Sequence, residues 1–216
     1  MNFYYLLIIL ISYLYGSIPF SLIIPKTFLN IDPRNYGSGN IGAANVLRTA
    51  GPVAGVICYL LDFSKGLLGA GLPILLSNLK YIEKNHWLII LGALAAIIGH
   101  CWTIFLKFKG GKGVATSMGT IITISPKIFL FFIIIYLIIL FTFRFASLAG
   151  IVTFGLLPII GYAVTYFWSN KIGLSQFLTF SIITAIIVIW RHKSNIKRLL
   201  NGTERRLGQK VKVEKE

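Results

Sequence analysis

The chain has 216 residues, of which 56% are hydrophobic and only 12% are charged, and its mean hydropathy is +0.80. A soluble domain would carry about a quarter charged residues, so this composition excludes an ordinary soluble domain and predicts an integral membrane protein. The net charge of +15 would suggest nucleic-acid binding in a soluble protein. Here the Lys and Arg residues collect between apolar segments, which indicates membrane topology and excludes nucleic acid as the expected partner.

The apolar segments predict one all-α domain over residues 1–216, a bundle of about seven membrane-spanning helices. A helix needs roughly 20 apolar residues to cross the hydrocarbon core. In chain order the stretches without Lys, Arg, Asp or Glu are 1–25, 50–79 (interrupted by Asp62 and Lys65), 85–106, 113–126, 128–143, 145–170 and 172–190. No Lys or Arg precedes the first stretch, and it is too long for a signal-peptide core, so we expect an uncleaved first span.

Residues 113–126 and 128–143 leave the number of crossings open, because both are short. If both cross, there are seven spans; if they form a re-entrant hairpin, there are five, with the same orientation of the tail. With the N-terminus outside, 16 of the 21 Lys and Arg residues fall on the side of the basic tail, residues 190–216. The positive-inside rule then predicts that this side, the C-terminus included, is cytoplasmic.

The first of three polar clusters covers residues 35–48 and contains three glycines, Ser38 and Arg48. Glycines beside cations are typical of phosphate sites, since backbone N–H groups approach the oxygens and the cation neutralises the charge. We expect a helix from near Gly42 through Arg48. The alternative is an ordinary interhelical loop in which Arg48 only anchors the topology.

The second cluster reads Gly110-Gly111-Lys112-Gly113. It lacks the Walker A spacing, and Gly113 stands where that motif has Ser or Thr, so a nucleoside-triphosphate site is not expected. A local anion cradle made by the amides of Gly110 and Gly111 with the Lys112 ammonium remains one interpretation. A flexible basic turn is the other.

The third cluster covers residues 191–203. It lies within residues 191–207, which predict an amphipathic helix along an anionic membrane surface. His192 and Asn195 have i, i+3 spacing and would share a face of that helix. His192 could act as a base, a donor or a phosphate ligand, or simply be an interfacial histidine among basic anchors. Ser147 could add a hydroxyl to the same site or cap a helix. Asp62 and Lys65, about one helical turn apart within a span, predict a mutual ion pair.

Two cysteines, Cys58 and Cys101, lie inside spans without CxxC spacing. No metal-ligand cluster is visible, so no metal and no cofactor are expected.

These motifs resemble those of the bacterial acyl-phosphate:glycerol-3-phosphate acyltransferases, the PlsY family. The similar stretches follow one another over nearly the whole chain: 16–20, 36–48, 62–66, 99–100, 105–116, 144–147 and 191–204. The departures are mild. Ile41 and Ala44 stand where the family usually has Pro or Thr, and Cys101 to Thr103 replace a Phe-Pro pair.

The resemblance implies a seven-helix protein of the bacterial inner membrane whose active site faces the cytoplasm. It implies transfer of a fatty acyl group from acyl phosphate to the sn-1 hydroxyl of glycerol 3-phosphate, giving lysophosphatidic acid and phosphate. We expect a monomer in contact with membrane lipid. The resemblance also implies that six residues line the active site: Ser38, Arg48, Lys112, Ser147, His192 and Asn195.

Acyl phosphate is already activated, and the chain has neither a GxSxG elbow nor the HxxxxD motif of thioester-using acyltransferases, so we expect direct transfer without an acyl-enzyme. Of the site residues, Ser38, His192 and Asn195 are the catalytic candidates. Arg48, Lys112, Ser147 and the Gly110 and Gly111 amides are expected to bind phosphate. The proton acceptor is either His192 or a substrate phosphate, the latter slightly favoured. A transporter for an organic phosphate and a non-catalytic scaffold for anionic lipid are the alternative functions.

Overall fold

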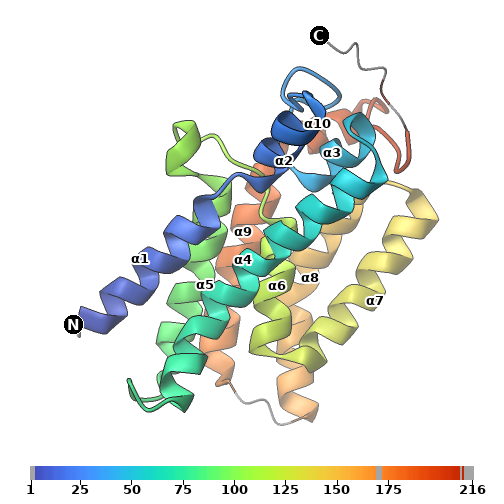
Figure 1. Cartoon of the computed structure of the whole chain (residues 1–216). Helices are drawn as coiled ribbons and strands as arrows, with labels where there is room; N and C mark the ends of the chain where they lie inside the picture. The colour runs from blue at the N-terminus through green and yellow to red at the C-terminus, as the bar shows by residue number, and fades with distance from the viewer. Residues whose placement is uncertain (1–2, 169–171, 210, 212–216) are drawn as a thin grey trace.

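The computed structural model describes residues 3–168, 172–209 and 211, and all regular secondary structure within these ranges is helical, without a β-strand (Figure 1). This confirms the all-α prediction. Lys171 and the end of the predicted basic tail, residues 212–216, lie outside the described residues. The helices are α1 (Phe3–Ser17), α2 (Phe20–Leu29), α3 (Ala43–Thr49), α4 (Pro52–Asn78), α5 (His86–Cys101), the 3-10 turn η1 (Ile104–Leu106), α6 (Val114–Ile124), α7 (Pro126–Phe143), α8 (Ala146–Phe167), α9 (Leu174–Arg191) and α10 (Lys193–Leu200).

Six segments of the described chain are long and apolar enough to cross a membrane, and a seventh apolar helix is shorter. The six are Phe3–Leu29, Pro52–Asn78, His86–Leu106, Pro126–Phe143, Ala146–Phe167 and Leu174–Arg191. Since α7 has the length and hydropathy of a span, the alternative in which it forms half of a non-crossing hairpin loses its basis. The 11-residue α6 is about 16 Å long, roughly half the hydrocarbon thickness.

The short helix α6 packs backbone to backbone against α4. A β-carbon on Gly66 would lie 1.9 Å from the Thr116 carbonyl oxygen, and one on Gly119 would lie 2.1 Å from the Phe63 carbonyl oxygen. The Thr116 hydroxyl also donates a hydrogen bond to the Asp62 carbonyl oxygen at 2.9 Å. Small residues allow this close approach, on which helix association in lipid depends. The start of α6 is therefore held at a fixed place along α4.

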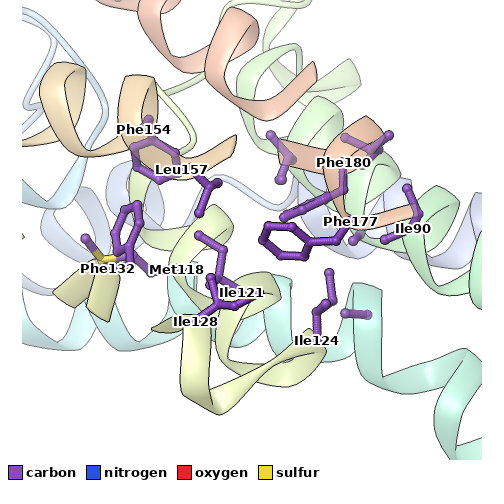
Figure 2. Close-up of a cluster of buried hydrophobic side chains, with 14 of the residues drawn as sticks. Ile90, Met118, Ile121, Ile124, Ile128, Phe132, Phe154, Leu157, Phe177 and Phe180 are labelled. Atoms are coloured by element: carbon purple, nitrogen blue, oxygen red, sulfur yellow. The ribbon is translucent and has the colours of Figure 1, made fainter. Parts of the chain in front are cut away.

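The apolar core lies among α5, α6, α7, α8 and α9 (Figure 2). Phe132 of α7 and Phe154 of α8 meet edge to face with their ring centroids 4.9 Å apart. Two turns further along α8, the Phe177 ring fills the space where a side chain at Gly161 would stand. Only 11% of the α7 span is buried within the protein, so most of this helix presents apolar side chains outward, as a lipid-facing helix does.

The predicted amphipathic helix over 191–207 is too long. α10 ends at Leu200, and Gly202 adopts a left-handed φ of 67°. The Thr203 N–H donates to the Arg198 carbonyl oxygen, which is the closing bond of a Schellman motif. The chain then crosses the end of the bundle, and the Leu207 N–H donates to the Arg144 carbonyl oxygen at 2.6 Å. The Asn-Gly-Thr sequence therefore stops the helix in the middle of the predicted amphipathic segment.

The α4–α6 contact predicts that alanine substitutions at two glycines of α4 differ strongly in their effect on stability. Gly66→Ala should lower the thermal unfolding temperature in detergent, because its β-carbon would collide with the backbone of α6; overpacking typically costs about 1–3 kcal/mol. Gly71→Ala is the matched control, since the nearest atom to its β-carbon is 3.8 Å away and both changes gain the same helix propensity. Equal stability of the two variants would contradict the close packing.

Candidate active site

Segments far apart in the chain enclose one cavity of about 140 Å³. The 38–48 segment, α4, α5, the loop before α6, α7, the start of α8, the α9–α10 junction and the tail all contribute to its lining. The structure brings together six of the eight predicted site residues on its wall: Ser38, Arg48, Lys112, Ser147, His192 and Asn195. The other two, Gly110 and Gly111, do not line it.

Asn45 organises the loop that carries Ser38. Its side-chain Oδ1 accepts a hydrogen bond from the Ser38 N–H at 2.9 Å, and its Nδ2 donates to the carbonyl oxygens of Pro33 and Tyr36 at 2.8 and 3.2 Å. Gly37 has a φ of +63°, and a β-carbon there would lie 2.2 Å from Asn45 Oδ1. The glycine therefore lets the loop close over the asparagine, which sets the place of Ser38 at the cavity wall.

Arg48 projects into the cavity from α3, the short helix predicted between Gly42 and Arg48. α3 packs on α4 through the buried residues Val46, Ala54 and Cys58. The Arg48 Nη2 donates to the Arg205 carbonyl oxygen at 3.2 Å. This bond ties the first cluster to the C-terminal tail, which crosses above it.

The glycines of the second cluster have a different role from the predicted one. The Gly110 N–H donates to the Cys101 carbonyl oxygen at 3.1 Å, and the Gly111 N–H donates to the His100 carbonyl oxygen at 3.0 Å. Both amides are thus engaged by the end of α5 and are not free to cradle a phosphate, so that prediction is wrong for this structure. A β-carbon on either glycine would lie within 2.2 Å of the His100 carbonyl oxygen or imidazole. The glycines serve the close packing of the loop against α5.

A chain of hydrogen bonds connects three predicted site residues through an acidic residue that the sequence analysis did not single out. Lys112 Nζ donates to Asn195 Oδ1 at 2.5 Å, and Asn195 Nδ2 donates to Glu204 Oε1 at 2.7 Å. The Ser147 hydroxyl donates to the same carboxylate oxygen at 2.8 Å, and Arg198 pairs with Oε2 at 2.7 Å. Ser147 is therefore bound to the tail rather than acting as a helix cap. The sequence signal for Glu204 was a carboxylate two residues after a helix-stopping glycine, Gly202, in a basic segment.

The two cations that line the cavity, Arg48 and Lys112, are partly buried and have no carboxylate ion pair. Burial lowers the pKa of Lys112 to about 8; the Glu204 carboxylate opposes this shift, and Arg198 and Arg48 add to it. Burial also lowers the pKa of Arg48. Among the described residues, the salt bridges connect other pairs and include neither Lys112 nor Arg48.

Glu204 is ionised despite its position. Burial raises its pKa, but hydrogen bonds from Asn195, Arg198 and Ser147 outweigh that effect and hold the pKa below its ordinary value. The carboxylate therefore acts as an internal anion among the cations of the cavity.

His192 is held as a neutral imidazole in a defined tautomer. Burial lowers its pKa to about 4, and the Lys112 charge lowers it further. The Nδ1 atom lies 2.7 Å from the Val188 carbonyl oxygen, and because a carbonyl only accepts, Nδ1 carries the proton. Nε2 is left as an acceptor. His192 stands at the junction of α9 and α10, and its own carbonyl oxygen accepts the Asn195 N–H at 2.8 Å, so both side chains reach the cavity.

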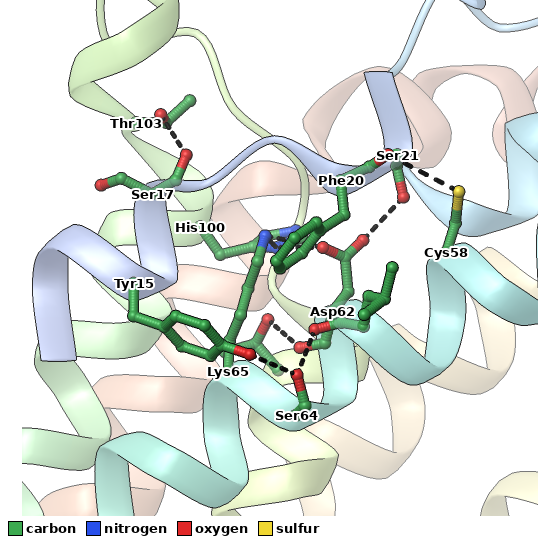
Figure 3. Close-up of polar contacts among 12 residues, drawn as sticks. Tyr15, Ser17, Phe20, Ser21, Cys58, Asp62, Ser64, Lys65, His100 and Thr103 are labelled. Atoms are coloured by element: carbon green, nitrogen blue, oxygen red, sulfur yellow. Dashed lines mark hydrogen bonds and ion pairs between the residues drawn. The ribbon is translucent and has the colours of Figure 1, made fainter. Parts of the chain in front are cut away.

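The predicted ion pair between Asp62 and Lys65 is present (Figure 3), and Asp62 is the member of the pair that lines the cavity. Lys65 Nζ lies 2.6 Å from Asp62 Oδ1, and both side chains are 2% exposed. The Ser21 hydroxyl donates to Asp62 Oδ2 at 2.7 Å, and His100 Nδ1 lies 3.6 Å from Oδ1. Asp62 and His100 line the cavity, although the sequence analysis assigned neither to the site.

The cavity as a whole is suited to anionic oxygens and a hydroxyl. It combines two partly buried cations, the Ser38 hydroxyl and a neutral imidazole acceptor. Cations and fixed donors of this kind stabilise phosphate and developing negative charge. Across the described ranges, no three His, Cys, Asp or Glu side chains meet as a possible metal site.

Most of the chain is similar to known proteins of one family. The family model of glycerol-3-phosphate acyltransferases matches residues 6–202. The glycerol-3-phosphate acyltransferase of Thermoanaerobacter sp. (strain X514) is 42% identical over 213 residues, covering 97% of this chain and 99% of that protein. The enzyme of Macrococcus caseolyticus (strain JCSC5402) is 44% identical over 198 residues, covering 92% and 94%.

Solved structures give the same result. The glycerol 3-phosphate form of PlsY (YgiH), an integral membrane glycerol 3-phosphate acyltransferase, superposes with a TM-score of 0.81 at 36% identity, covering 95% of this chain and 96% of that one. Its lysophosphatidic acid form gives 0.80 at 35%, with the same coverage. These likenesses remove the transporter and scaffold alternatives. The chain belongs to the glycerol-3-phosphate acyltransferase family and is a multi-pass membrane acyltransferase of the PlsY type.

Proposed function

We propose that the enzyme takes its acyl group from acyl phosphate and transfers it directly to the sn-1 hydroxyl of glycerol 3-phosphate. The observation that carries this proposal is the pair of partly buried cations, Arg48 and Lys112, in one cavity without carboxylate ion pairs. An acyl phosphate and glycerol 3-phosphate each bring a phosphate group, and the two repel one another. Two cations in a low-dielectric cavity offset that repulsion and hold both reactants together.

Direct transfer is supported by the surroundings of the serines. In the described part of the chain, the Ser147 hydroxyl donates to Glu204, and the His192 ring bonds a main-chain carbonyl rather than a serine. A serine nucleophile needs an adjacent base to become reactive. We therefore assign Ser38 and Ser147 to hydrogen bonding of phosphate oxygens.

The reaction then proceeds in one transfer step. The hydroxyl oxygen of glycerol 3-phosphate attacks the acyl carbon, the bond from that carbon to the phosphate oxygen breaks, and inorganic phosphate leaves. His192 Nε2 accepts a hydrogen bond from the attacking hydroxyl and orients it. With a pKa of about 4, the imidazole is a weak base, so the proton passes to a phosphate oxygen of the substrate. Asn195 positions Lys112 through its 2.5 Å hydrogen bond.

We further propose a monomer in the bacterial inner membrane whose active site opens to the cytoplasm. The excess of Lys and Arg on the side of the tail supports this orientation. Tyr59 of α4 and Tyr136 of α7 line the cavity. They form an aromatic wall on helices that also face lipid, so the acyl chain would lie between α4 and α7 and reach the cavity sideways from the bilayer.

The donor proposal is tested with purified protein in detergent. With palmitoyl phosphate and glycerol 3-phosphate, we expect lysophosphatidate and free phosphate in equal amounts, and no product from a palmitoyl thioester. Mass spectrometry after incubation with palmitoyl phosphate alone should give the unmodified protein mass. Comparable turnover with the thioester, or an acylated protein that glycerol 3-phosphate discharges, would contradict the proposal.

The role of His192 predicts different outcomes for two substitutions. His192→Gln keeps a side-chain acceptor and should retain kcat within about tenfold, whereas a lost general base typically costs about 10²–10⁴. His192→Ala has no acceptor and should lose clearly more activity than His192→Gln. Steady-state kinetics of the two folded variants checks this. If both variants instead lose about 10²–10⁴-fold in kcat, His192 is the group that accepts the proton.

The buried lysine predicts an alkaline limit to activity. Because the pKa of Lys112 is lowered to about 8, the ammonium is charged below that pH and becomes neutral above it. Hence kcat/KM for glycerol 3-phosphate should fall as the pH rises through about 8. We call this fall of kcat/KM the alkaline limb of the pH profile. In Lys112→Arg, whose guanidinium stays charged, the alkaline limb should move to higher pH. A limb that stays in place in the arginine variant would belong to another group.

A further inference from the structure

Arg191, the last residue of α9, contacts the loop that carries Lys112 but does not line the cavity. Its Nε donates to the Gly111 carbonyl oxygen at 2.9 Å, and its Nη2 donates to the Gly110 carbonyl oxygen at 2.6 Å. One guanidinium thus binds two successive carbonyls with two parallel donors. Only the fork of an arginine has this geometry, because a lysine is a point charge on a flexible stem.

Two tryptophans hold the guanidinium in place. Arg191 lies over the ring of Trp102, 5.7 Å from its centroid, and Trp102 stacks on Trp190 with centroids 5.6 Å apart and an interplanar angle of 29°. Trp102 follows the last residue of α5, and Trp190 precedes Arg191 in α9. The arginine therefore connects the ends of two helices to the loop between α5 and α6.

The loop is fixed from both sides at the same two residues. The N–H groups of Gly110 and Gly111 bond the carbonyls at the end of α5, and their own carbonyls bond Arg191. Every backbone polar group of this glycine pair is thus engaged. Lys112 follows directly, so the position of its backbone depends on both sets of bonds.

We propose that Arg191 is a positioning residue for the acyl transfer: it clamps the Gly110–Gly111 carbonyls and thereby holds Lys112 at the depth where it meets a substrate phosphate. The proposal rests on the phosphate-binding role given above to Lys112. It assigns to Arg191 a function separate from its neighbour His192, which lines the cavity itself.

Arg191→Lys keeps the positive charge but removes the two parallel N–H donors of the guanidinium. It keeps a cation over Trp102 but cannot hold both carbonyls, so we expect kcat/KM for glycerol 3-phosphate to fall about tenfold, mostly through KM. The charged groups that act on Lys112 are Glu204 of the tail, Arg198 of α10, Arg48 of α3 and Arg191 itself. All keep their charge in this variant. A shift of the alkaline limb above pH 8 therefore reports that Lys112 has left its buried position.

Arg191→Met removes both the parallel N–H donors and the positive charge. Its kcat/KM should therefore fall further than that of Arg191→Lys, by about 100-fold. Lys193→Gln is the matched control: Lys193 lies over the outer ring, Trp190, at 5.1 Å, and its loss should leave kinetics and pH limb at wild-type values. Thermal unfolding in detergent is measured for each variant. A purely structural role would lower the unfolding temperature without changing KM or the limb.

The result that overturns the proposal is an Arg191→Lys variant with wild-type KM and an unmoved alkaline limb. Loss of folding in both variants would assign Arg191 to the stability of the bundle and overturn it as well. Calorimetric binding of glycerol 3-phosphate to the same proteins gives a readout without a donor, and weaker binding to Arg191→Lys is expected. If the wild-type protein binds glycerol 3-phosphate but does not use acyl phosphate, only the donor proposal fails.

Discussion

The candidate site depends on two partly buried cations, Arg48 and Lys112, that no ion pair neutralises among the described residues. Removing an ammonium or guanidinium from water costs several kcal/mol even after relaxation, and the lowered pKa of Lys112 is a direct expression of that cost. The protein meets it with a single short hydrogen bond from Lys112 to Asn195 and a tail carbonyl on Arg48. A bound phosphate would supply the missing counter-charge. The cavity is therefore complementary to an anion before one arrives, which is the arrangement that favours charge developing in a transition state.

The helices provide the rigidity that this arrangement needs. α6 begins only at Val114 because the preceding residues pack on the end of α5, and this explains why it is shorter than its neighbours. Its position along α4 is set by the contact of Gly66 with Thr116, directly beside the Asp62–Lys65 ion pair. The same stretch of α4 thus carries Asp62, which lines the cavity, and contacts the helix that follows Lys112. A shift of α6 along α4 would displace both.

The sequence predicted the features that hydrophobicity and charge decide, and missed those that tertiary packing decides. The apolar segments followed from their length, and six residues that line the cavity followed from motif resemblance, whereas the number of crossings stayed open between five and seven. The role of Gly110 and Gly111 did not, because a glycine that brings an amide to a ligand and a glycine that lets a loop touch a helix look alike in a sequence. Glu204 was missed because its burial results from a turn at Gly202 that folds the tail back over the bundle.

Glu204 explains how the site keeps its charge when no substrate is bound. Its carboxylate raises the pKa of Lys112 against the effect of burial and raises that of Arg48 in the same way. Without it, Lys112 would lose its proton at a lower pH. The carboxylate bonds Ser147 and Asn195, however, and not the lysine itself. It therefore stabilises the charge from a distance while leaving the ammonium free of an ion pair, so that a phosphate can bind Lys112 without first displacing a carboxylate from it.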